Sequence, residues 1–139
     1  MSTGSTQLIN PATGEALDDE VPSTDEAGTD AAIDRAQEAF RRWRSTAPGE
    51  RARLLRSFAS KVEENIERLA AAEVRNAGHT IGNARWEAGN VRDVLDYYAG
   101  APERLTGRQI PVAGGLDITF PEPLGVVGII VPWNFPMPI

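Results

Sequence analysis

Residues 124–131 (LGVVGIIV) form the feature that most constrains the fold of this chain. The run is too short to cross a membrane, and its glycines interrupt it too often for a helix. Its β-branched residues favour a fully buried strand, of the kind found in a parallel sheet that is covered on both faces. Such a strand needs neighbours, so the run predicts an α/β fold.

Polar and aromatic residues follow this predicted strand at its carboxyl end. Pro132 stops the strand because it cannot donate to a hydrogen-bond ladder. Trp133 and Asn134 then come where open α/β sheets place their ligands. Pro136 keeps Phe135 extended, since proline disfavours the helical region for the residue before it. The sequence therefore predicts an amide held between an indole and a phenyl ring at a ligand-binding edge.

Composition excludes several classes of function. The 139 residues carry a net charge of −6 and a pI near 4.8, which argues against a nucleic-acid-binding surface. The chain contains no cysteine, so it has no disulfide, thiolate metal site or thiol nucleophile of its own. We predict no metal site. Residues 1–7 lack the basic and apolar regions of a secretory signal, so we expect a cytoplasmic protein without membrane attachment.

The first 106 residues are predicted to form a strand pair and three amphipathic helices. The strands cover residues 7–9 and 16–21, around a turn that contains Asn10-Pro11 and Gly14. Ser23 and Glu26 predict a capping box for the first helix. We expect the second helix to run from Pro48 to Gly78 and the third from Thr80 to about residue 102.

Two short strands at 108–112 and 116–122 follow, joined by Ala113-Gly114-Gly115, whose glycines suggest a hairpin or a sharp bend. An isolated pair of strands is only marginally stable in water, so this arm is expected to lie on a sheet or on another subunit. The strand at 124–131 has no parallel neighbour in the sequence, which predicts an incomplete domain.

Seven segments together resemble the aldehyde dehydrogenase superfamily in order and spacing, from about residue 7 onward. They are Asn10–Glu15, Phe40–Trp43, Pro48–Leu55, Tyr97–Gly100, Gly107–Pro111 and, with the greatest specificity, Glu122–Gly128 and Pro132–Pro136. The resemblance implies the N-terminal part of a longer, Rossmann-type cofactor-binding domain. Residues 1–106 would belong to that domain, 107–122 would form an oligomerisation arm for a homodimer or homotetramer, and 123–139 would hold the first buried strand of its sheet.

The resemblance also implies the chemistry. In this family a cysteine thiolate adds to an aldehyde, a hydride leaves for NAD or NADP, and a glutamate-activated water hydrolyses the thioester. Asn134 would donate its side-chain N–H to the oxyanion. The backbone of Ile130, Val131, Pro132 and Trp133 would line the ribose and nicotinamide of the cofactor. The nucleophile and base are expected outside this segment, which alone would be inactive. From the residues alone, an Asx-type turn is an equal interpretation of Asn134.

Four residues are candidates for the wall of the aldehyde site by the same resemblance: Trp86, Glu87, Asn90 and Phe135. A packed contact between helices is an equally good interpretation of the three that lie on the helix. His79 stands where the family often has Lys, and we expect it at the surface near a helix C-terminus, without metal-binding partners.

Three other functions remain open. The chain could be a short scaffold or interaction module that binds partners through its arm. It could bind a small molecule between Trp133 and Phe135 without chemistry. A CoA-acylating or phosphate-dependent relative of the aldehyde dehydrogenases would keep the fold and change the reaction.

Overall fold

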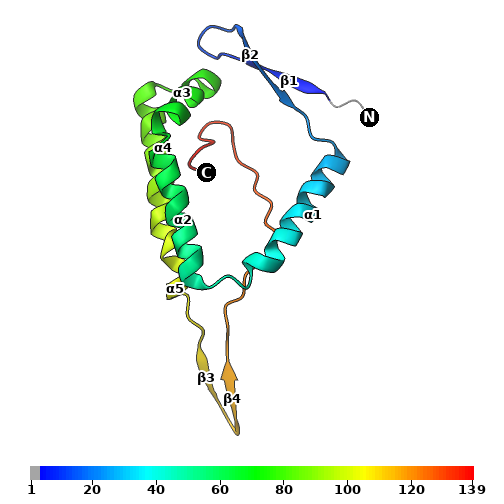
Figure 1. Cartoon of the computed structure of the whole chain (residues 1–139), viewed down its shortest axis with the longest axis vertical. Helices are drawn as coiled ribbons and strands as arrows, with labels where there is room; N and C mark the ends of the chain where they lie inside the picture. The colour runs from blue at the N-terminus through cyan, green and yellow to red at the C-terminus, as the bar shows by residue number, and fades with distance from the viewer. Residues whose placement is uncertain (1–3) are drawn as a thin grey trace.

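The computed structural model describes residues 4–139, which form a two-stranded sheet, a group of helices, a second two-stranded sheet and an extended final segment (Figure 1). Strands β1 (Ser5–Ile9) and β2 (Ala16–Pro22) pair antiparallel, with Gln7 opposite Glu20. The register shifts between Gln7 and Ile9. Of the helices that the structure describes, none is long and apolar enough to span a bilayer.

Four longer helices follow, α1 (Glu26–Trp43), α2 (Pro48–Glu63), α3 (Ile66–Ala77) and α4 (Ile81–Ala99). The single helical turn α5 (Ala101–Arg104) comes directly after α4 in the chain. The Asp25 carboxylate begins α1 by accepting the N–H of Gly28 at 2.8 Å, so the predicted capping box at Ser23 is not the one used. Thr80 and Pro48 begin α4 and α2 as predicted, Thr80 as the capping residue and Pro48 as the first helical residue.

The predicted helix from Pro48 to Gly78 is two helices. Asn65 interrupts it with a φ of −118°, and its side-chain amide donates to the Lys61 carbonyl at 2.8 Å. A polar side chain that bonds the preceding turn competes with the helical ladder, which explains the break. The apolar periodicity continues across it, so the sequence pattern did not reveal it.

Alanines form most of the core between α2, α3 and α4. The buried apolar residues within the described range are Ala52, Ala59, Val62, Ala70, Ala84, Ala88 and Ala99. Several large apolar side chains of the amphipathic helices remain exposed, including Ile33 of α1 at 50% and Phe58 of α2 at 57%. Helix α1 buries no residue. The helical faces predicted as core are therefore only partly covered in this chain.

Strands β3 (Gln109–Val112) and β4 (Gly115–Ile118) form the predicted arm as an antiparallel hairpin, which projects away from the helices in Figure 1. At its base Arg108 and Thr119 exchange backbone and side-chain hydrogen bonds of 2.9 Å. A methyl group on Gly107 would lie 1.8 Å from the Thr119 carbonyl oxygen. Only glycine permits this approach of the two backbones.

Residues 124–131 are not a strand in this structure. They run extended from α1 towards α3, with Leu124 96% and Ile130 100% exposed (Figure 1). A buried strand requires a ladder on both sides, and the described residues supply none. The described residues therefore do not form the predicted buried strand at 124–131. It stays a prediction for a protein in which further strands are present.

Gly78 joins the first sheet to the helices. It ends α3 with a φ of +75°, and a methyl group there would lie 2.6 Å from Cγ of Pro11 in the β1–β2 turn. The predicted C-terminal position of this glycine is confirmed, and the contact with Pro11 adds a second reason for it.

We expect Gly78→Ala to destabilise the protein by roughly 1–2 kcal/mol from the left-handed backbone alone, and further through the contact with Pro11. Gly82→Ala is the matched control, because nothing lies within 4 Å of its added methyl group and its helix gains from alanine. Urea unfolding of both variants measures the difference. Equal destabilisation by the two substitutions would contradict this account of Gly78.

Candidate active site

The predicted site begins at the exposed turn that contains Asn134. Trp133 and Asn134 lie in a turn, with Trp133 84% exposed, and Phe135 is 42% exposed. Ile130, Val131 and Pro132 precede them in the extended segment, and all three are exposed. The amide is thus presented at the surface of the described residues, beside two aromatic rings as the sequence predicted.

Two contacts fix the ends of this segment against the helices. Gly125, Val126 and Val127 lie in a groove of about 510 Å³ against the apolar face of α1, which includes Phe40 and Trp43. At the other end the Phe135 ring lies 5.4 Å from the His79 ring, at an angle of 57°. The turn that carries Asn134 is therefore held between α1 and the α3–α4 connection.

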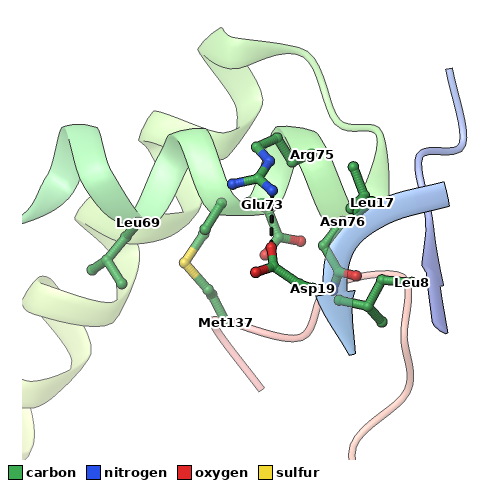
Figure 2. Close-up of a pocket in the computed structure, with 9 residues that line it drawn as sticks. Leu8, Leu17, Asp19, Leu69, Glu73, Arg75, Asn76 and Met137 are labelled. Carbon is green, nitrogen blue, oxygen red and sulfur yellow. Dashed lines mark hydrogen bonds and ion pairs between the residues drawn. The ribbon is translucent and has the colours of Figure 1, made fainter. Parts of the chain in front are cut away.

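A second groove, of about 310 Å³, lies next to this end of the segment (Figure 2). Leu8 and Leu17 from the first sheet, Leu69 from α3 and Met137 from the final segment line it together. An ion pair of 2.9 Å between Arg75 and Asp19 crosses from α3 to β2 beside it. The groove joins the first sheet, α3 and the final segment, and Glu73 points into it from the helix.

Trp86, Glu87 and Asn90 do not share one environment, although all three lie on α4. Trp86 is 64% exposed, while Asn90 is half-buried. Glu87 is fully buried and its Oε1 lies 2.5 Å from Nδ1 of His79. Phe135 also contacts His79. The structure thus separates Glu87 from the exposed surface of Trp86, because residues one apart on a helix face different sides.

His79 is not at the surface as we predicted, since only 19% of its side chain is exposed. It lies between two buried carboxylates, with Nδ1 at 2.5 Å from Glu87 and 3.8 Å from Glu73. Burial, and then the charge of Glu87, raise the pKa of Glu73 above its ordinary value. The sequence signal for this cluster was weak, because Glu73 lies six residues before His79 and Glu87 eight residues after it, on two different helices.

Exposed ion pairs tie α4 to its neighbours around this cluster. Arg85 donates to both carboxylate oxygens of Glu67 on α3, at 2.9 and 2.8 Å. This bond lowers the pKa of Glu67. Arg92 donates to one carboxylate oxygen of Glu63 on α2. Such exposed pairs add little stability individually, but they orient α4 and therefore Trp86, Glu87 and Asn90.

Comparison with known proteins gives one consistent result. The sequence profile of the aldehyde dehydrogenase family matches residues 1–139. Hydroxyisobutyraldehyde dehydrogenase of Mycolicibacterium austroafricanum is 40% identical over 130 residues, which is 93% of this chain and 26% of that protein. The chain therefore spans about a quarter of the length of such relatives.

Solved structures agree. Succinate-semialdehyde dehydrogenase from Burkholderia pseudomallei superimposes with a TM-score of 0.92 at 31% identity, over 97% of this chain and 28% of that one. PnpE in complex with nicotinamide adenine dinucleotide superimposes with a TM-score of 0.77 at 30% identity, over 81% of this chain and 23% of that one. The predicted fold class, the N-terminal part of an aldehyde dehydrogenase-like α/β protein, is confirmed by these matches.

Proposed function

Because this chain belongs to the aldehyde dehydrogenase family, we propose that its protein oxidises an aldehyde to a carboxylic acid with NAD or NADP as the hydride acceptor. The observation that carries the proposal is the match of the family profile along residues 1–139, with the motif Pro132–Pro136 intact. The relatives are named for different aldehydes, so the proposal names the substrate by its class alone.

Asn134 is the residue of this chain to which we assign a part in the chemistry. A cysteine thiolate would add to the aldehyde carbon, and negative charge would then grow on the aldehyde oxygen. An amide N–H stabilises this charge without ionising, so it does not repel it. The chain contains no cysteine, so the nucleophile would belong to residues outside it. The exposed position of Asn134 supports this role, since its amide is open to a ligand.

The cofactor would approach the backbone of Ile130, Val131, Pro132 and Trp133. These four residues are exposed along the extended segment, and Asn134 follows directly. An arrangement in which cofactor-facing backbone leads into the oxyanion donor would bring the hydride acceptor and the reacting carbon together. This adjacency in sequence supports the assignment of both roles to one segment.

We expect Asn134→Ala to lower kcat by about 10²–10³-fold while the fold is unchanged, because it removes one donor to the oxyanion. Asn76→Ala, at an exposed position on α3, should keep full turnover and serves as the matched control. NAD(P)H formation with a panel of aldehydes measures both, in the intact protein. Wild-type turnover by a folded Asn134→Ala variant would end the assignment.

The product distinguishes this proposal from its chemical relative. Hydrolysis gives a free carboxylic acid without CoA, whereas an acylating enzyme requires CoA and gives a thioester. Mass spectrometry of the products with and without CoA therefore separates the two reactions. A protein that forms no NAD(P)H with any aldehyde would instead favour a binding or scaffold role.

Trp86, Asn90 and Phe135 are proposed to line the aldehyde site, and the exposed indole of Trp86 is the main support. An exposed Trp offers a large apolar surface for a substrate. We leave Glu87 out of this wall because it is fully buried against His79. Trp86→Ala should change the ratio of kcat/KM between a short and a long aliphatic aldehyde, and an unchanged ratio would remove Trp86 from the site.

The 107–122 arm is proposed to join subunits into a homodimer or homotetramer. Its apolar side chains are open to contact, with Leu116 68% and Phe120 77% exposed. A hairpin of this kind needs a partner surface for stability. Leu116→Glu should shift the mass in light scattering towards the monomer, with Asp117→Glu as the control. An unchanged mass for Leu116→Glu would contradict the role of the arm.

A further inference from the structure

His79, Glu73 and Glu87 form a buried cluster that the proposed reaction does not use. Glu73 comes from the last turns of α3, His79 from the connection, and Glu87 from the second turn of α4. Glu73 is 6% and Glu87 0% exposed, and Glu87 is the largest fully buried side chain in the described part of the chain. Two carboxylates at this depth require partners, because burying an isolated charge is costly.

The described residues do not satisfy these carboxylates. Oε1 of Glu73 and Oε2 of Glu87 are buried and have no hydrogen-bond partner within residues 4–139. His79 can place only one hydrogen on Nδ1, and Glu87 Oε1 lies closest to it at 2.5 Å. The arginines on either side along the helices are engaged elsewhere, Arg75 with Asp19 and Arg85 with Glu67. Two buried carboxylate oxygens of the cluster are therefore left without a donor among the described residues.

The geometry of the cluster matches a small cation. One ring nitrogen and one oxygen from each carboxylate lie within 4.8 Å of one another. Zn²⁺ holds such ligands at about 2.0–2.2 Å, which sets them roughly 3.3–3.6 Å apart around a tetrahedron. The observed separations from Nδ1 are 2.5 and 3.8 Å, on either side of that range. The ion would take the place of a hydrogen on Nδ1, and the three ligand atoms already lie close to the spacing that one ion requires.

We propose that Glu73, His79 and Glu87 bind a divalent transition-metal ion of the Zn²⁺ class. Imidazole and carboxylate together suit this class of ion. The ion would join the C-terminus of α3 to α4, and it would hold the His79 ring against Phe135. Its role would be structural, and it does not depend on the oxidation of aldehydes proposed above.

The test compares the intact protein with variants of this cluster after metal has been removed with EDTA. Calorimetric titration with Zn²⁺ alone at pH 7.5 should find one more bound ion per chain in the wild type than in His79→Lys or Glu87→Gln. Because either substitution removes one of three direct ligands, we expect it to weaken binding by more than the roughly 10–100-fold that a change in an outer-shell partner typically costs. Glu67→Gln, which removes an exposed carboxylate of α3, should bind as the wild type does.

His79→Lys also separates a loss of metal binding from a loss of folding. Its ammonium group would supply a fixed cation to the same carboxylates, so this variant should remain folded without metal. Zn²⁺ should raise the Tm of the wild type and leave the Tm of His79→Lys unchanged, since only a ligand of the native state stabilises it. These readouts do not involve dehydrogenase activity, so they remain informative if the proposed function fails.

Two results would overturn the proposal. One is a wild-type Tm that does not respond to Zn²⁺. The other is an equal number of bound ions in the wild type and in folded His79→Lys, which would place the binding elsewhere in the protein. If Glu87→Gln does not fold, Glu73→Gln replaces it as the second ligand variant.

Discussion

The close packing of α2 against α4 through alanines is the interaction on which the rest of the described structure depends. Ala52 and Ala59 of α2 and Ala84 and Ala88 of α4 are at most 1% exposed. Small side chains allow two helix axes to approach closely, so backbone contact replaces the large apolar side chains of most cores. This scaffold fixes the α3–α4 connection, which carries Gly78 and His79, and the Asn134 turn contacts the structure through His79.

The final segment depends on that scaffold in a different way. It has no ladder partners in the described residues, and it is held at its ends by α1 and by the ring of His79. The apolar side chains along it are exposed, among them Leu124 and Ile130. The prediction that this segment is a buried strand requires neighbouring strands that the described residues do not supply. Because the segment is extended, its contact with α1 at residues 125–127 and the Asn134 turn lie at opposite ends of it.

Local signals in the sequence predicted most of the helices and strands. Features that depend on contacts between residues distant in sequence were not predicted. Thr80 and Gly78 act at helix ends as their residue types indicate. The hairpin forms at the predicted joint, with Ala113 and Gly114 in the turn and Gly115 beginning β4. The break at Asn65 was missed because a polar residue competes with the helix only through its own side-chain bond. The strand at 124–131 was predicted from its composition, but strand pairing depends on distant residues that composition does not describe.

The candidate site divides in the same manner. Asn134 was found because its motif is contiguous and its amide has a clear chemical use. The cluster around His79 was missed, since Glu73 and Glu87 approach it only when α3 turns back into α4. A lone histidine beside a helix-ending glycine predicts a surface position, and tertiary packing overrode that expectation. The available signal was the presence of a glutamate on each helix that flanks the connection, Glu73 on α3 and Glu87 on α4.

The position of the Asn134 amide in a ternary complex tests the central claim most directly. A crystal structure of the intact protein with NAD or NADP and a bound aldehyde adduct would give the distance from the side-chain nitrogen to the adduct oxygen. The account predicts about 2.7–3.1 Å, the range of an oxyanion donor. An amide that instead bonds the backbone of its own turn, with the adduct oxygen held by other groups, would contradict it.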